Sequence, residues 1–281
     1  MTAVTIANRQ TELANGLKIA YYDSGDKEGV LPQGAAAVLL HGFCGSSAYW
    51  EDVLPLIGGL GRIIIPDLRG HGLSSAASEE VYAMESFADD LAELLRQLSV
   101  ERVCLFGHSL GGYVSLAFAE KHPDKLESFG LIHSTSLPDS DQAKIGRDKA
   151  VNTIRTEGIE TFVNGLVPKL FAPEHIETME KALKRVTAIG YATSPEAAAA
   201  TALGMKSRKD RRSVLENLEV PRLLVAGSED GVIPAKNTFT SEGKNVSQVL
   251  LSGSGHMSMV ESPAELGNRI SAFVRHLYVK K

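Results

Sequence analysis

Six short apolar runs, separated by helix-like segments, constrain the fold of this chain most strongly. Each run is continuously apolar or β-branched instead of alternating with polar residues, so each predicts a strand buried on both faces. Strands of this kind form a parallel sheet with helices on both faces. The runs cover Ala35–Leu40, Arg62–Ile65, Arg102–Phe106, Ser128–Ile132, Arg222–Ala226 and Gln248–Leu251. The sequence therefore predicts an α/β fold.

An antiparallel strand pair is expected at one edge of this sheet, within Thr5–Tyr22. Asn15-Gly16 is a favoured hairpin dipeptide and marks the turn between the two strands. The pair completes a mostly parallel sheet of eight strands. Farther along, the segment Ser262–Glu265 combines an N-cap serine, a proline at the first helical position and a glutamate three residues after the cap. It predicts the start of a helix.

The segment between His133 and Arg222 contains no convincing strand and is far longer than one crossover helix. Ile176, Met179, Leu183 and Val186 recur at helical spacing, which predicts an amphipathic helix. We expect residues 138–207 to form a helical cap inserted into a core domain of residues 1–137 and 208–281. Periodicity alone is equally consistent with a lid that shapes a substrate site and with helices that only extend the core.

Composition excludes several classes of partner. The chain has 281 residues and a net charge of −5, without a lysine and arginine cluster that would attract nucleic acid or an anionic membrane. No apolar run approaches the length of a membrane span, and Met1–Gln10 does not resemble a secretory signal. Cys44 and Cys104 do not form a disulfide framework. We expect a cytoplasmic protein that acts on a small molecule, and nothing in the sequence indicates its oligomeric state.

A serine occupies the junction between a predicted strand and a predicted helix. Gly107-His108-Ser109-Leu110-Gly111 follows the run that ends at Phe106 and precedes a helix-like segment reaching Lys121. Such a turn projects a serine hydroxyl outward at the carboxyl edge of a sheet. A β-carbon at Gly107 or Gly111 would collide with this tight turn. Ser109 is therefore a candidate nucleophile.

Two further strand ends supply the partners that an activated serine needs, a base and a carboxylate that orients it. The run ending at Ala226 leads to Asp230, and the run ending at Leu251 leads to His256. Glu229 competes with Asp230, because either carboxylate could occupy the loop. The backbone N–H groups of Phe43 and Leu110 are candidate donors to an oxyanion.

Four segments together make the chain resemble the α/β-hydrolase fold family from about residue 30 to its end. They are His41–Gly45, Pro66–Ser74, Gly107–Gly112, and Asp230–Pro234 with Gly255-His256. The resemblance implies Ser109 as nucleophile, His256 as general base, Asp230 as its orienting acid, and Phe43 and Leu110 as oxyanion donors. The family's spacing to Pro234 favours Asp230 over Glu229.

The resemblance, with serine at the nucleophile position, favours cleavage of a carboxylic ester through an acyl-enzyme. The same apparatus serves cofactor-free haloperoxidases or perhydrolases and carbon–carbon bond hydrolases, and some ligand receptors of this fold retain it. No cofactor is expected, and no metal-binding motif is present. The predicted substrate-binding residues are mostly apolar and include no cation: Cys44, Trp50, His133, Phe171, Val232, Ile233 and Met257. They predict a small or medium, uncharged acyl group.

Overall fold

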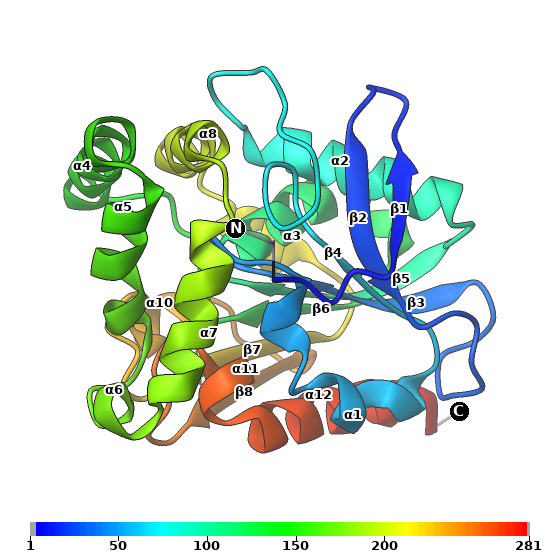
Figure 1. Cartoon of the computed structure of the whole chain (residues 1–281). Helices are drawn as coiled ribbons and strands as arrows, with labels where there is room; N and C mark the ends of the chain where they lie inside the picture. Colours follow the sequence, from blue (N-terminus) through cyan, green and yellow to red (C-terminus); the bar gives the residue numbers. More distant parts are fainter. Residues whose placement is uncertain (1–3, 280–281) are drawn as a thin grey trace.

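The computed structural model describes residues 4–279 and contains one sheet of eight strands in the order β1-β2-β4-β3-β5-β6-β7-β8 (Figure 1). The first three residues of the N-terminal segment, in which we saw no secretory pattern, lie outside this range. β1 and β2 are antiparallel to their neighbours, and the other pairings are parallel. The strands are β1 (Arg9–Glu12), β2 (Lys18–Asp23), β3 (Ala35–Leu40), β4 (Ile63–Pro66), β5 (Arg102–His108), β6 (Leu126–Ile132), β7 (Arg222–Gly227) and β8 (Val246–Leu251). The predicted α/β fold is confirmed.

Helices cover both faces of the sheet (Figure 1), with α2 and α3 on one face and α1 and α12 on the other. The α-helices are α1 (Leu54–Ile57), α2 (Met84–Gln97), α3 (Leu110–Lys121), α4 (Asp141–Glu157), α5 (Ile159–Leu166), α6 (His175–Thr178), α7 (Glu180–Tyr191), α8 (Pro195–Lys206), α9 (Arg212–Asn217), α10 (Ala235–Thr238), α11 (Ser258–Glu261) and α12 (Pro263–Val279). The 3₁₀ helices are η1 (Ser47–Trp50), η2 (Gly58–Leu60), η3 (Pro123–Lys125) and η4 (Val167–Leu170). α12 begins at Pro263, as its capping sequence predicts.

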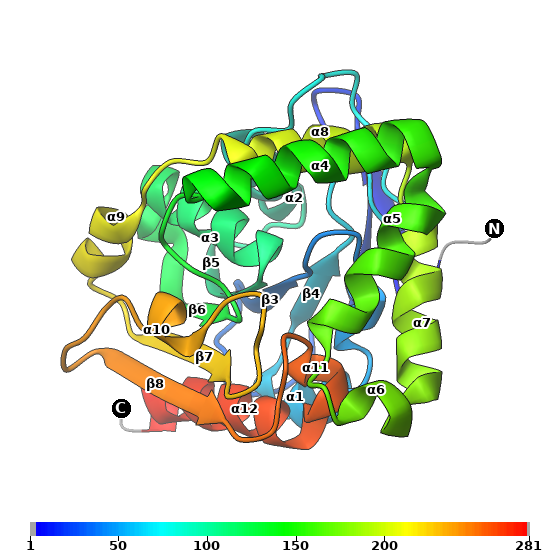
Figure 2. The same cartoon turned by 90° about the vertical axis from the view of Figure 1, so that its left-hand side faces the viewer.

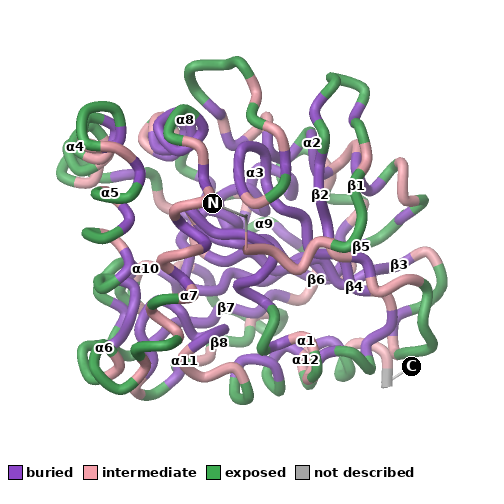
Figure 3. Tube along the Cα trace, in the orientation of Figure 1, coloured by how far each residue is buried: buried purple, intermediate pink, exposed green. Residues whose placement is uncertain are grey.

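The core lies between the sheet and these helices (Figure 3). All six residues of β3 are buried, as its continuously apolar sequence requires for a strand covered on both faces. α3 is also buried along most of its length, because it packs directly on β5 and β6. The two cysteines are free and buried. Within residues 4–279, no helix is both long enough and apolar enough to cross a membrane.

Between β6 and β7 the described chain is helical and contains no strand. We call residues 138–207 the cap segment; it contains α4 to α8, and α4 packs along α8 (Figure 2). Serines cap two of these helices: Ser140 Oγ accepts from Ala143 N at 3.2 Å, and Ser194 Oγ accepts from Ala197 N at 3.0 Å. The helix predicted across residues 176–186 is wrong in one respect. It is broken at Met179 into α6 and α7.

Candidate active site

Ser109 lies on a strained turn between β5 and α3. Its φ of 50° and ψ of −113° fall in a region that side chains other than glycine rarely adopt. A β-carbon on Gly107 would lie 2.3 Å from the carbonyl oxygen of Gly111, and one on Gly111 would lie 2.6 Å from the carbonyl oxygen of Leu40. The predicted steric need for both glycines is confirmed. This turn lies at the carboxyl end of β5.

Asp230 and His256 meet at the same edge of the sheet. The Nδ1–H of His256 donates to Asp230 Oδ2 at 2.8 Å, and the backbone N–H groups of Val232 and Ile233 donate to Oδ1, both at 2.9 Å. Glu229 is exposed, and its carboxylate accepts from the hydroxyl of Ser228 instead. Asp230 is therefore the carboxylate that orients His256. Orientation through Nδ1 leaves Nε2 as the nitrogen available for chemistry.

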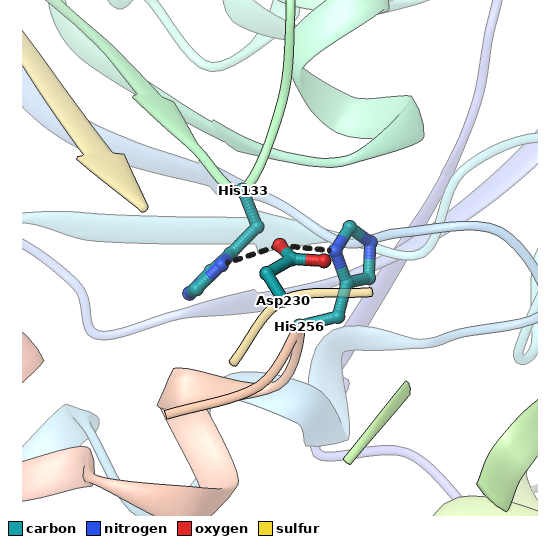
Figure 4. Close-up of side chains that lie close together, drawn as sticks. All are labelled: His133, Asp230 and His256. Atoms are coloured by element: carbon teal, nitrogen blue, oxygen red, sulfur yellow. Dashed lines mark hydrogen bonds and ion pairs between the residues drawn. The ribbon is translucent and has the colours of Figure 1, made fainter. Parts of the chain in front are cut away.

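His133 contacts the same carboxylate oxygen as His256, from the opposite side (Figure 4). Its Nδ1–H donates to Asp230 Oδ2 at 3.0 Å, and its Nε2 accepts from the Ser258 hydroxyl at 2.7 Å. Burial lowers the pKa of His133, so the ring is neutral at neutral pH. Burial alone would raise the pKa of Asp230, but the two histidines lower it well below its usual range. The carboxylate is thus ionised, fully hydrogen-bonded and fixed in orientation.

His133, Asp230 and His256 are also a group whose ligand atoms lie within 4.8 Å of one another, as a metal site would require. The two Nδ1 to Oδ2 distances, 3.0 and 2.8 Å, are hydrogen-bond distances, and an ionised carboxylate only accepts, so each ring donates its Nδ1–H to Asp230 and neither Nδ1 offers a lone pair to a cation. The donor arrangement fits a hydrogen-bond network better than a metal site.

Two backbone N–H groups lie at the positions expected for an oxyanion site. Leu110 N follows Ser109 at the first position of α3, and Phe43 lies in the loop after β3. The loop lies against the serine, because a β-carbon on Gly42 would be 3.4 Å from Ser109 Cβ. Within residues 4–279, neither N–H has a hydrogen-bond acceptor. Both donors therefore remain available to a ligand.

Ser109 and His256 line one small cavity of about 60 Å³, although no hydrogen bond joins their side chains within the described residues. Catalytic hydrogen bonds are often loose before substrate binds. The lining residues are Phe43, Tyr49, His108, Ser109, Tyr113, Arg147, Leu166, Leu170, Met205, Val232 and His256. Ligand pockets usually measure about 300–1,000 Å³. This cavity is thus smaller than most ligand pockets, and side chains of the cap segment form part of its wall.

Only one of the predicted substrate-binding residues lies in the described lining of this cavity. Of them, Val232 lines the cavity, together with the predicted oxyanion donor Phe43. The others are buried and lie outside its lining: Cys44, Trp50, His133, Phe171, Ile233 and Met257. Sequence reasoning missed Arg147, Leu166, Leu170 and Met205, which all come from the cap segment. The expected absence of a cation is wrong, because Arg147 forms part of the wall.

Glu261 joins the His256 loop to the cap segment. Its buried carboxylate accepts from the backbone N–H groups of Gly255 and Met257 at 3.1 and 2.9 Å, and from Ala172 N at 2.9 Å. His175 Nδ1 lies 2.7 Å from the same carboxylate. Nothing in the sequence marked Glu261, because its partners lie up to 89 residues away.

Larger hollows lie away from the serine. One of about 680 Å³ lies between residues 77–82 and helices α4 and α8, and one of about 580 Å³ lies beside residues 26–35. Neither includes Ser109, Asp230 or His256 in its lining. Of these three hollows in the described part of the chain, the small one is lined by Ser109 and by His256, which Asp230 orients.

Comparison with known proteins agrees with the fold described above. The alpha/beta hydrolase fold family model matches residues 37–263. The dihydrolipoyllysine-residue acetyltransferase component of the acetoin cleaving system of Pseudomonas putida is 30% identical over 86% of this chain. The match covers only 64% of that protein, so the chain spans less than two thirds of it.

Two other similar proteins match over nearly their whole length. A putative carbamate hydrolase, RutD, of Rhizobium rhizogenes is 26% identical over 87% of this chain and 94% of its own. The solved structure of a thermophilic esterase from Thermogutta terrifontis, with malate bound, has a TM-score of 0.88 and 28% identity over 96% of this chain and 99% of its own. The family model matches most of the chain, and the sheet order and the serine turn after β5 agree with it. This chain therefore belongs to the alpha/beta hydrolase fold family.

Proposed function

We propose that this hydrolase cleaves carboxylic esters through an acyl-enzyme on Ser109. The main support is that Ser109 and His256 line one cavity while His256 is held by Asp230. A serine on a strained turn, a histidine and an orienting carboxylate are the groups that acyl transfer requires. The esterase and the putative carbamate hydrolase among its relatives are named for the hydrolysis of related acyl groups.

In the proposed mechanism, Ser109 Oγ attacks the ester carbonyl while His256 Nε2 accepts the hydroxyl proton. His256 then returns this proton to the departing alcohol, and a water molecule attacks the acyl-enzyme in the same way. Asp230 keeps the proton on Nδ1 and stabilises the imidazolium that forms. The N–H groups of Phe43 and Leu110 stabilise the oxyanion, and each such donor is worth about 10²- to 10³-fold in rate.

The proposed substrate is a small or medium ester that reacts in the cytoplasm, beneath a cap formed by residues 138–207. The cavity wall supports a largely apolar acyl group, because Leu166, Leu170 and Met205 approach the serine from the cap segment. Movement of these side chains would admit substrate and then exclude water from the acyl-enzyme.

Hydrolysis of p-nitrophenyl esters from acetate to decanoate tests the proposal. We expect multiple turnovers and an acyl adduct on the intact protein, with kcat/KM reduced on the order of 10⁴-fold or more in Ser109→Ala. Ser115→Ala, in the helix that follows Ser109 but outside the cavity, is the matched control and should retain activity. Undiminished turnover in Ser109→Ala would refute the proposal. A single slow turnover by the wild type would instead favour a ligand receptor.

A further inference from the structure

Arg147 is the one permanently charged side chain in the described lining of the cavity above Ser109. It is brought there by α4 and stands among aromatic, aliphatic, hydroxyl and imidazole groups. No carboxylate lines this cavity in the described chain. An arginine in an otherwise neutral wall calls for an explanation, because a partly desolvated guanidinium needs an anionic partner.

The carboxylate of Asp139, which is the acidic partner of Arg147, compensates only part of the positive charge at this place. Asp139 is buried, and its two oxygens accept from two arginines: Arg147 Nε donates to Oδ2 at 3.0 Å, and Arg208 Nη1 donates to Oδ1. The side chain of Asp139 is 3% exposed. One carboxylate thus faces two guanidinium groups, which leaves one positive charge uncompensated at the cavity wall.

The two arginines differ in how many N–H donors remain available to a ligand. Arg208 lies over the ring of Tyr113 at 4.0 Å and also donates to the carbonyl oxygens of Leu137 and Met205, both at 3.1 Å. Arg147 is bonded through Nε alone, and within residues 4–279 its two Nη groups have no acceptor. Its side chain is 26% exposed. Arg147 is therefore the arginine with donors left for a ligand.

The neighbouring acids do not remove this surplus. Asp148, the next residue along α4, accepts from Lys206 Nζ at 2.6 and 2.8 Å. Asp141 is fully exposed and lies 3.5 Å from Lys144. Each of these carboxylates has its own lysine, so neither compensates Arg147.

We infer that Arg147 binds a carboxylate on the substrate, at a distance from the ester that Ser109 attacks. A guanidinium with two free Nη groups matches the planar geometry of a carboxylate. The substrate class is then a half-ester of a dicarboxylic acid, or another ester that carries a carboxylate beyond a short apolar segment. This inference rests on the proposed esterase function and narrows its substrate.

Matched pairs of methyl esters test the carboxylate site at Arg147 separately from the esterase function. Methyl pentanoate and monomethyl glutarate, and methyl hexanoate and monomethyl adipate, differ by a terminal carboxylate. We expect the wild type to favour the half-ester of each pair by about tenfold or more in kcat/KM, as a charged hydrogen bond allows. Arg147→Gln should abolish this preference, because the half-ester then loses the charged partner of its carboxylate. Arg147→Lys should retain part of it, which also guards against a folding defect in the glutamine variant.

Lys149→Gln removes the same charge from an exposed position two residues along α4 and should behave as the wild type. Calorimetry with glutarate and adipate tests the anion site without turnover, and binding should be lost in Arg147→Gln alone. Equal half-ester preference and equal dicarboxylate binding in the wild type and Arg147→Gln would overturn the inference. Hydrolysis of neutral esters that requires Ser109 would then leave the proposed function standing. Dicarboxylate binding through Arg147 without hydrolysis of any ester would reject the esterase function and retain the anion site.

Discussion

At the scale of single residues, the second histidine on Asp230 most distinguishes this site. His133 has a φ of 47°, so its backbone is strained like that of Ser109. The strain places its ring where one nitrogen donates to Asp230 and the other accepts from Ser258. Because Asp230 Oδ2 serves both histidines, His133 fixes the direction in which the carboxylate faces His256. We interpret His133 as a positioning residue.

Replacing His133 should therefore impair turnover more than binding. Asn tolerates a positive φ but its shorter side chain cannot span both partners, so His133→Asn frees the Asp230 carboxylate on one side. We expect kcat to fall about tenfold, by analogy with the loss of groups that hydrogen-bond to the ligands of a metal ion and orient them, with KM changed less than kcat. Ser258→Ala keeps the hydrogen bond between His133 and Asp230 and should lower kcat less than His133→Asn does. Equal kcat losses in the two variants would contradict a role exerted through Asp230.

The sequence identifies some of these residues and not others, for a physical reason. Ser109, Asp230 and His256 each follow a predicted parallel strand, and the carboxyl ends of such strands meet at one edge. Their proximity could therefore be predicted. Arg147 lies in the middle of a helix with mixed polarity, and only the packing of the cap segment brings it over Ser109. No local pattern specifies that packing.

At the scale of elements, Glu261 couples the His256 loop to the cap segment. It ends α11, and its carboxylate binds both the loop before that helix and the chain between η4 and α6. His256 N also donates to Leu170 O at 2.7 Å. The base of the cap segment is thus attached to the loop that carries His256, while within the described chain Glu261 makes no hydrogen bond to α4 or α5.

Glu261→Gln tests this coupling. The amide group would face backbone N–H donors, leaving at least one of them buried without an acceptor, at a cost of about 1–3 kcal/mol in the free energy of unfolding. We expect hydrogen exchange to increase in residues 167–178 and to remain unchanged in the middle of α12. Glu265→Gln, at an exposed position in α12, is the matched control. Unchanged exchange in residues 167–178 would show that Glu261 does not secure the cap segment.

Strands were easier to predict than the helices over the site. β3 was predicted with its observed bounds, and the other five runs differed from their strands by one or two residues at an end, because buried apolar runs are distinctive. The expectation of burial on both faces is wrong for the edge strand β8, in which only Leu251 is buried. The single helix predicted through Met179 is wrong, because residues on its N-terminal side contact residues that are distant in the sequence. His175 is held by Glu261, and Ile176 is 40% exposed, so the apolar stripe does not continue through both helices. Tertiary contacts override the local period.

At the scale of the whole molecule, the fold buries four histidines that should govern its stability in mild acid. They are His41, His71, His108 and His133, and burial lowers the pKa of each. The values reach about 4 for His41 and about 3 for His71, against 6.5 for an ordinary histidine. Below pH 6.5 the unfolded chain therefore binds protons at these histidines that the folded chain does not. Acid should favour unfolding well before most carboxylates titrate.

We accordingly expect the free energy of unfolding to fall as pH decreases from 6.5 to about 4. Each buried histidine contributes a slope of at most about 1.4 kcal/mol per pH unit. Urea unfolding at pH 7.5, 6.0, 5.5, 5.0 and 4.5 measures this slope. His71→Gln should reduce this slope by nearly the contribution of one buried histidine, whatever the effect of the substitution on the free energy of unfolding at pH 7.5. Val38→Ala, a destabilising change in the buried strand β3, should keep the full slope because it removes no titratable group. A wild-type protein equally stable at pH 7.5 and 4.5 would mean that these histidines accept protons in the folded state as readily as in the unfolded chain.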